Sequence, residues 1–168
     1  MRGIATDTDA RFTIAYDRPA MWHVVNPDRT NALGYPVGFM LHASGNALPL
    51  VDADDPALGR AQFATHHLWV TPYDPAERYA AGSYPNQSAP GEGLAAWTSR
   101  RRSIEKQDLV LWYTLGFHHV PSAEDWPVYN LGWHSVTLKP YNFFDRNPAV
   151  DVPPPATAPT SASSDRQD

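Results

Sequence analysis

Residues Leu109 to Phe117 read LVLWYTLGF, and this run is the most informative part of the sequence. Bulky apolar side chains stand at odd and even positions alike, although successive residues of a strand point to opposite faces. The pattern predicts a central β-strand that is buried on both faces. A buried helix is the alternative, but the β-branched and aromatic content, with Gly116 inside the run, favours a strand.

Shorter β-like stretches lie on either side of this run. We expect strands at residues 22–25, 34–41, 68–70 and 133–139, the first ending at Asn26-Pro27 and the last at Pro140. A short helix is expected from Pro56, because Asp55 supplies a cap and proline suits the first helical position. The sequence therefore predicts a mainly β fold with short helices and long loops.

The composition is that of one globular domain. The chain has 168 residues, of which 42% are apolar and 18% are charged, and this is enough for one core. We expect residues 1–18 to form an irregular N-terminal segment and residues 19–152 to form the packed part. Residues 153–168 lack the apolar side chains that could offset their ordering entropy, so they are expected to be a disordered tail.

Charge and composition argue against several partners and ligands. A net charge of -5 without a lysine-rich tract argues against nucleic acid and against an anionic membrane surface. The polar N-terminus and the lack of a long apolar run predict neither a signal peptide nor a membrane helix, and hence a cytoplasmic location. Because the sequence has no cysteine, any metal must be held by histidine, carboxylate or carbonyl groups.

Two histidine pairs are candidate metal ligands. His118 and His119 follow the long apolar run, and neighbours on a strand point to opposite faces, so one metal can take only one of them. His66 and His67 stand in the same arrangement before a predicted strand. For both pairs the commoner alternative is a histidine that donates to a carbonyl group inside the fold.

Charged side chains mark three further places. Glu124 and Asp125 precede a Trp-Pro turn and are expected to accept hydrogen bonds from backbone amides rather than to act as a catalytic pair. Asp108 precedes the apolar run, where it forms a turn or, with a neighbouring carbonyl group, holds a hard cation. Residues 100–102 with Lys106 form a small basic cluster that is typical of a solvated face.

Several segments, taken in order, resemble one protein family. They are RAQFA at 60–64, HLWVTPY at 67–73, ERY at 77–79, NQ at 86–87, DLVLWY at 108–113, EDWPV at 124–128 and FFDRNP at 143–148. Over residues 22–152 the chain resembles the last portion of the catalytic domain of the copper-containing amine oxidases.

The resemblance implies part of a large antiparallel β-sandwich that dimerises in the family. It also implies the oxidation of primary amines by oxygen to aldehydes, with release of ammonia and hydrogen peroxide. The family's cofactors are a copper ion held by three histidines and topaquinone, a quinone made from a tyrosine of the same domain. Many members also carry a peripheral calcium-type site.

The resemblance assigns three residues of this chain to metal sites. His119 matches the third copper ligand, which places His118 on the opposite face as a packing or hydrogen-bonding residue. Asp108 and the carbonyl group of Leu109 match part of the peripheral calcium-type site. Eleven residues of extended chain put Asp108 roughly 36 Å from His119, so the two sites are separate. Tyr129 stands where the family has a methionine near the metal.

Other parts of the family's active site have no counterpart in these 168 residues. The sequence contains no His-x-His, no Asn-Tyr-Asp or Asn-Tyr-Glu triplet, and nothing that matches the segment with the family's aspartate base. The triplet Asp7-Thr8-Asp9 has the form of the remaining calcium ligands but not their context, and it is not carried over. We therefore expect the chain to be inactive alone, as a remnant or as half of a split enzyme completed by another chain. The alternative is a non-catalytic β-sandwich domain that binds a protein or a small ligand.

Overall fold

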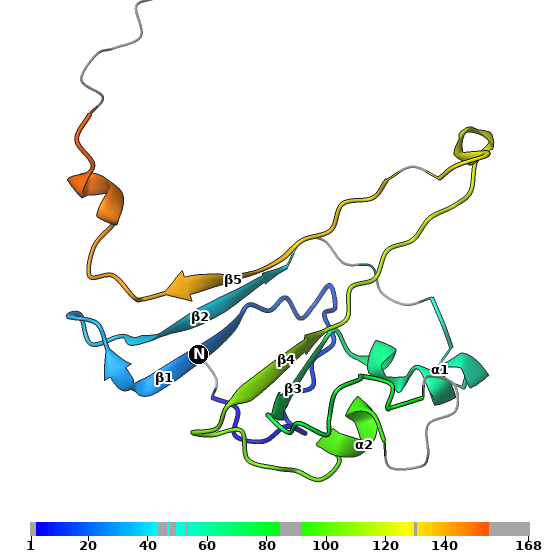
Figure 1. Cartoon of the computed structure of the whole chain (residues 1–168), viewed down its shortest axis with the longest axis horizontal. Coiled ribbons are helices and arrows are strands. Elements are labelled where there is room, and N and C mark those ends of the chain that lie inside the picture. The colour runs from blue at the N-terminus through cyan, green and yellow to red at the C-terminus, as the bar shows by residue number, and fades with distance from the viewer. Residues whose placement is uncertain are drawn as a thin grey trace, which may run out of the picture.

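A computed structural model describes residues 3–43, 47, 50–52, 54–84, 92–129 and 131–154. Within these residues the strands form a three-stranded and a two-stranded sheet, both antiparallel, and the helices are short (Figure 1). The prediction of a mainly β, antiparallel fold with short helices is confirmed. No described helix has the length and apolar character needed to cross a membrane.

The three-stranded sheet has the order β1-β2-β5, with β1 at Trp22–Thr30, β2 at Pro36–Ala43 and β5 at Val136–Tyr141. Strand β1 continues past Asn26-Pro27, where it was predicted to end, and its register shifts between Asn26 and Thr30. Strand β5 likewise contains Pro140. Both strands are edges of the sheet that the described residues form, and an edge tolerates a proline that cannot donate a hydrogen bond.

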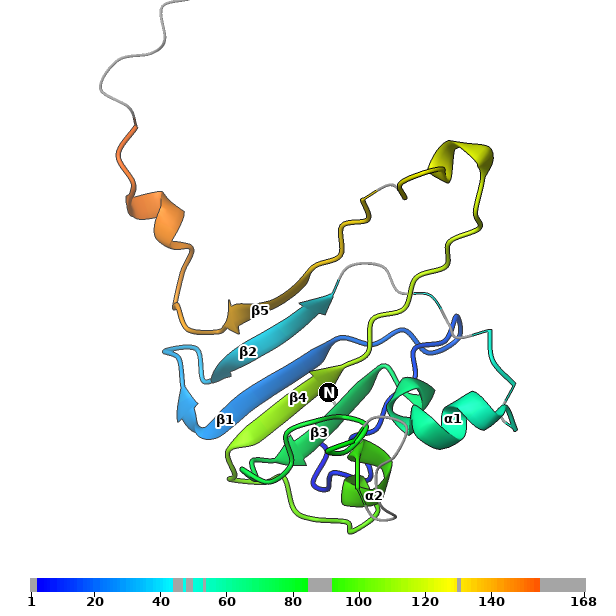
Figure 2. The same cartoon turned by 45° about the vertical axis from the view of Figure 1, so that its right-hand side comes forward.

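The two-stranded sheet pairs β3 (Leu68–Pro72) with β4 (Leu109–Tyr113), and its two faces enter different clusters. On one face, Leu68 and Val70 join Leu41 of β2 in a core that also takes in Leu111 and Tyr113. On the other face, Trp69 packs with Leu94 and Trp97 of helix α2 (Leu94–Thr98), and Trp112 of β4 lies against this cluster. In Figure 2, α2 accordingly lies beside the β3–β4 pair on the side away from β1.

The apolar run at residues 109–117 is only partly the strand that its pattern predicts. Its side chains do reach both faces of the sheet, but β4 ends at Tyr113 and all five of its residues are half-buried. Among the described strands, β4 pairs with β3 alone, so the prediction of a central strand is wrong for this part of the chain. The Thr114 N–H still donates to the His67 carbonyl (2.8 Å), and beyond it the chain leaves the sheet, with Phe117 exposed.

Short helices occupy the connections. Helix α1 (Pro56–Arg60) begins as predicted, with the Asp55 side chain accepting a hydrogen bond from the Ala57 N–H. The remaining elements are 3₁₀ turns: η1 (Gln62–Thr65), η2 (Ala123–Asp125) and η3 (Pro148–Asp151).

The N-terminal segment is irregular but packed. Ala10 lies in the core with Leu68, and Asp7 is fully buried. Phe12 forms an isolated bridge with Leu68 at the edge of β3. Tight packing therefore extends well before Pro19, because backbone and carboxylate hydrogen bonds rather than an apolar run hold this segment.

A charged network fixes that segment to the connection between β3 and β4. The Arg102 guanidinium donates to Asp7 Oδ2 (2.9 Å) and to both carboxylate oxygens of Glu77 (2.8 and 3.1 Å), and the Arg102 N–H donates to Asp7 Oδ1 (2.9 Å). Partial burial acts to lower the pKa of Arg102, but the hydrogen bonds that it donates to Glu77 and Asp7 outweigh this effect and hold that pKa above its ordinary value. The basic cluster is therefore not wholly a solvated face, as the sequence had suggested.

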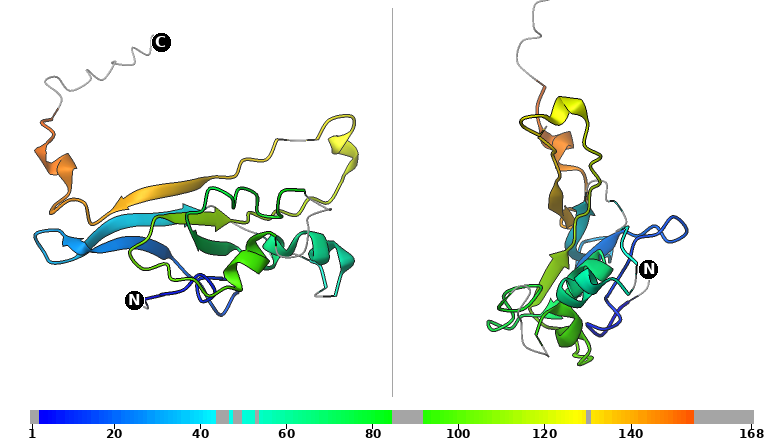
Figure 3. Two further views of the ribbon diagram at one scale, coloured as in Figure 1. Left: turned by 60° about the horizontal axis from the view of Figure 1, so that its bottom comes forward. Right: turned by 90° about the vertical axis from the view of Figure 1, so that its right-hand side faces the viewer.

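Two segments extend away from the sheets. Residues 114–135, which we call the arm, run outward from β4, turn at η2 and return to β5 (Figure 3). After β5 the chain passes the β1–β2 turn, where the Ala32 N–H donates to Asp145 Oδ1 (2.7 Å), and then forms η3. Of the predicted C-terminal tail, residues 155–168 lie outside the described residues.

Replacing Arg102 by methionine will destabilise the fold, because it leaves the buried Asp7 carboxylate without a cation and Glu77 with only Arg100, at 3.3 Å. We expect the free energy of unfolding to fall by about 3–5 kcal/mol, the usual cost of removing one partner from a buried ion pair. Urea denaturation followed by tryptophan fluorescence measures this loss. Arg101→Met is the matched control, since Arg101 pairs with the half-exposed Asp9 at 3.7 Å and its loss should cost less than about 1 kcal/mol. Equal losses in the two variants would contradict the role given to Arg102.

Candidate metal centre

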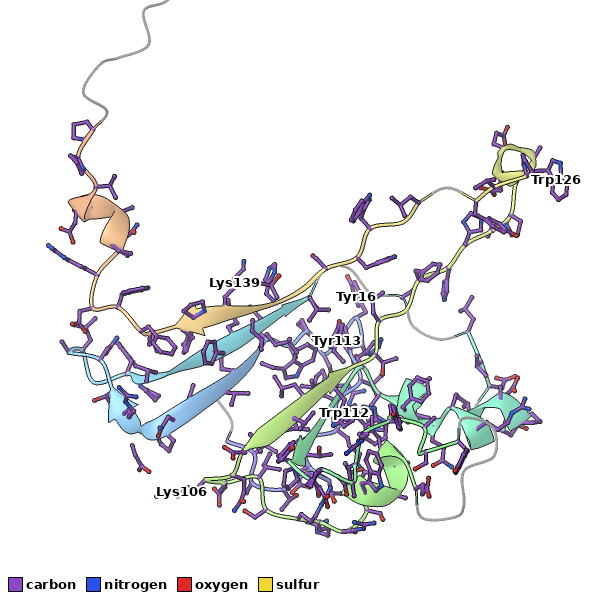
Figure 4. The ribbon with its side chains drawn as sticks, viewed as in Figure 1. Tyr16, Lys106, Trp112, Tyr113, Trp126 and Lys139 are labelled. Atoms are coloured by element: carbon purple, nitrogen blue, oxygen red, sulfur yellow. The ribbon has the colours of Figure 1, made fainter. Side chains whose placement is uncertain are left out.

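The predicted copper ligand His119 lies near the outer end of the arm. The tip of the arm is marked by Trp126 in Figure 4, far from Lys106 at the start of the β4 region. Beyond Gly116, the ring contacts of the arm join its own two legs, as in the pair Phe117–His134 at 5.3 Å between centroids.

The backbone at the tip is held by a capping box around η2. The Ser122 side chain accepts a hydrogen bond from the Asp125 N–H, and the Asp125 carboxylate accepts one from the Ser122 N–H at 2.7 Å. The prediction that a carboxylate of this turn bonds a backbone amide is confirmed for Asp125. Two backbone donors are thereby satisfied within four residues, which fixes the turn locally.

The same Asp125 carboxylate holds the His119 ring. His119 Nε2 lies 3.0 Å from Asp125 Oδ2, and the Asp125 side chain is only 7% exposed while that of His119 is 40% exposed. With an ionised carboxylate as acceptor, Nε2 must carry the hydrogen. The hydrogen bond thus selects one tautomer of His119 and leaves Nδ1 as the nitrogen with a free lone pair.

The ionised state of Asp125 supports this assignment of the His119 tautomer. The hydrogen bond from the Ser122 N–H holds the pKa of Asp125 below its usual value, with a further lowering from His119 and an opposing effect of burial. The neighbouring Glu124 also has a lowered pKa, because it accepts a hydrogen bond from the Ser122 hydroxyl. Both carboxyl groups are therefore ionised at neutral pH, as acceptors rather than as acids.

Tyr129 and His118 complete the surroundings of His119. The Tyr129 ring meets the His119 ring edge-on, with centroids 5.3 Å apart and planes at 84°. The position where the family has a methionine thus lies directly beside the predicted copper ligand. His118 is exposed and has no hydrogen bond or ring contact with the described residues, so its expected packing role is not seen there.

One imidazole with a free Nδ1 and a carboxylate on Nε2 fits a copper ligand. Histidines that bind metals usually donate their second ring nitrogen to a carboxylate or a carbonyl group, which fixes the ring. Within the described residues, however, no group of three or more His, Asp or Glu side chains is placed to hold a metal ion. Among the described residues, the arrangement thus presents one oriented imidazole nitrogen, Nδ1 of His119.

Asp108 and Leu109 each have an oxygen group that could coordinate a cation. The Tyr73 N–H donates to the Asp108 carbonyl (2.7 Å), so the next pair in the antiparallel ladder, Pro72 and Leu109, is not hydrogen-bonded. The Leu109 carbonyl hence points to the edge of β4 that pairs with no described strand. The exposed Asp108 carboxylate has no ion pair or hydrogen bond among these residues. A carboxylate and a carbonyl oxygen suit a hard cation.

The other candidates have structural partners. His67 is buried, and its Nδ1 accepts a hydrogen bond from the Ile14 N–H, while His66 Nδ1 lies 2.8 Å from Thr65 Oγ1. Asp7 is bound to Arg102 and is not available to a cation. Sequence reasoning missed the contact of Asp125 with His119, although the spacing Ser122-x-x-Asp125 signals a capping box that brings this carboxylate back toward the preceding strand.

Comparison with known proteins agrees with the resemblance found in the sequence. A family model described as the copper amine oxidase enzyme domain matches residues 2–158. The chain belongs to the copper amine oxidase family. Copper amine oxidase relatives include "Amine oxidase [copper-containing] gamma 1" of Arabidopsis thaliana, 45% identical over 89% of this chain and 21% of that protein. Histamine oxidase of Arthrobacter globiformis is 43% identical over 88% of this chain and 22% of that protein.

Solved structures of copper amine oxidases share the fold. The copper-containing benzylamine oxidase from Hansenula polymorpha superposes with a TM-score of 0.75 and 36% identity, over 86% of this chain and 23% of that chain. The amine oxidase of Aspergillus nidulans gives 0.72 and 29%, over 89% of this chain and 21% of that chain. The chain thus spans about a fifth of the length of these copper amine oxidases.

Asp125→Ala will release the His119 ring, because it removes the acceptor of Nε2–H and one half of the capping box. In the wild-type chain without copper, ¹⁵N NMR of the histidine rings should show His119 predominantly as the Nε2–H tautomer. In the alanine variant the ring should become a mixture of tautomers. Glu124→Ala, which removes the adjacent carboxylate, should leave the His119 signals unchanged. A wild-type ring without a preferred tautomer would refute the hydrogen bond.

Proposed function

We propose that this chain is the C-terminal part of a copper amine oxidase catalytic domain and supplies one copper ligand, His119. The reaction in question is the oxidation of a primary amine by oxygen to an aldehyde, ammonia and hydrogen peroxide. The observation that carries the proposal is the His119–Asp125 hydrogen bond of 3.0 Å, which orients an imidazole with Nδ1 free. A merely structural histidine at the exposed end of an arm would not need this orientation.

The chain's own residues would act by positioning. His119 would hold copper through Nδ1, and Asp125 would keep the proton on Nε2 and prevent the ring from turning. Tyr129 would pack against the other side of the imidazole. Copper and topaquinone, when bound, would supply the redox chemistry of amine oxidation. Asp108 and Leu109 would hold calcium with one carboxylate and one carbonyl oxygen, far from the copper.

The proposal includes a dependence on residues outside this sequence. A single imidazole binds copper(II) weakly, since this ion prefers several nitrogen and oxygen ligands. The sequence has no His-x-His and no Asn-Tyr-Asp or Asn-Tyr-Glu triplet, so the further histidines and the quinone tyrosine would have to be supplied by other polypeptide. The division into residues 1–18, 19–152 and 153–168, and the formation of a dimer or of a two-chain complex, stay predictions.

The isolated chain should produce no hydrogen peroxide when copper, oxygen and a primary amine are added, because no residue of it can form an imine with the amine as topaquinone does. A coupled peroxidase assay measures this. Mixing the chain with a polypeptide that carries the family's His-x-His and quinone tyrosine should restore peroxide release and the quinone absorbance. Turnover by the chain alone would overturn the proposal, and a stable monomer that never complements would favour the non-catalytic binding domain.

His119→Ala should weaken copper(II) binding by the chain at least tenfold, since it removes the oriented imidazole. Isothermal titration and the nitrogen hyperfine pattern in electron paramagnetic resonance report on the ligand directly and do not require enzyme activity. His118→Ala is the matched control, as His118 is the adjacent exposed histidine, and its affinity should equal that of the wild type. An unchanged titration for His119→Ala would remove this residue from the copper site.

A further inference from the structure

The N-terminal segment is fastened to β3 by a hydrogen bond that depends on the protonation of a histidine. The Ile14 N–H donates to His67 Nδ1 at 3.0 Å, and the His67 residue is only 4% exposed. A ring nitrogen of histidine accepts a hydrogen bond only when it carries no proton. In the native fold His67 is therefore neutral, with its hydrogen on Nε2, and a second proton at Nδ1 would convert the acceptor into a donor that faces another donor.

Ordinary backbone hydrogen bonds flank this one. The Phe12 N–H donates to the Leu68 carbonyl (2.9 Å), and the N–H groups of His67 and Leu68 both donate to the Phe12 carbonyl (2.9 and 3.0 Å). Beyond Ile14 the chain turns between Ala15 and Arg18 and enters β1. Among the described residues, the bond from Ile14 to His67 is thus the last hydrogen bond between this segment and the start of β3 before the chain enters β1.

The charged and titratable groups near this hydrogen bond are basic. Arg11, from the same N-terminal segment, and His66 are the neighbouring basic groups, and β4 contributes the phenol of Tyr113 but no charged side chain. Burial, followed by the charges of Arg11 and His67, lowers the pKa of His66. A proton on His67 Nδ1 would face the Ile14 N–H inside the fold, and opening the adjacent segment to water would separate these two donors.

We propose that His67 is a pH-sensitive latch: its protonation in weak acid frees the Ile14 backbone from its bond to His67, while Asp7 stays bound to Arg102. The opening is local, because the contacts of Asp7 with Arg102 lie between a carboxylate and a guanidinium, which does not lose its charge in this pH range. Residues 14–18, which lead from the N-terminal segment toward β1, would then gain conformational freedom. This device goes beyond the proposed function, since it involves neither copper nor amine.

Amide hydrogen exchange of the full chain, resolved by NMR, tests the latch. After correction for the intrinsic pH dependence of exchange, the protection of the Ile14 amide should fall about tenfold or more between pH 7.5 and pH 5.5. The amides of Leu68 and Arg102 should keep their protection. In His67→Asn the amide oxygen stands close to the former place of Nδ1 and does not titrate, so Ile14 should stay protected at both pH values.

His66→Asn is the matched control, because it removes the adjacent titrating ring and leaves the acceptor of Ile14 in place. It should lose protection at Ile14 in acid as the wild type does. The proposal is overturned if protection at Ile14 does not change with pH in the wild type, or if His67→Asn responds to acid like the wild type. It is also overturned if Leu68 and Arg102 lose protection together with Ile14, since acid would then unfold the whole domain. His67→Gln, with a longer uncharged acceptor, replaces His67→Asn should the latter fail to fold.

Discussion

The alternation of side chains along β3 is the constraint on which the rest of this structure depends. Leu68 and Val70 enter the core shared with the three-stranded sheet, whereas Trp69, between them, enters the cluster around α2. Successive side chains of a strand point to opposite faces, so a shift of β3 by one residue would exchange the two sets and disrupt both cores at once. The indole N–H of Trp69 donates to the Phe63 carbonyl (2.9 Å), which further fixes the register.

Features that depend on short-range chemistry could be predicted from the sequence. The cap at Asp55, the strand at Leu68 and the amide-bound carboxylate of Asp125 each follow from a few neighbouring residues. The packed N-terminus could not be predicted, because Asp7 meets Arg102 across 95 positions of sequence and neither residue is apolar. The end of β4 at Tyr113 was missed for a related reason: apolar content shows that a strand can be buried but not where its neighbouring strand stops.

The residues of the candidate copper site likewise include some that the sequence could predict and some that it could not. The family resemblance predicted His119, and hydrophobic periodicity had no means of distinguishing it from His118, since both histidines follow the same apolar run. The structure separates them by their partners: His119 contacts Asp125 and Tyr129, and His118 is exposed without a described contact. The carboxylate that holds His119, that of Asp125, lies six positions along the chain, in a turn whose capping motif is visible in the sequence but whose direction of return is not.

The contacts that orient the His119 ring are local. All the contacts that fix His119 come from within ten residues, namely its hydrogen bond with Asp125, the capping box of Ser122 and the edge of Tyr129. Such short loops cost little entropy to close, so the ring does not need the rest of a catalytic domain in order to present Nδ1. The surrounding arm is different, because Val120 and Trp133 are both 86% exposed and stabilise nothing among the described residues. Orientation of the His119 ring and burial of the arm are therefore separable, since the first depends on contacts within the arm and the second does not.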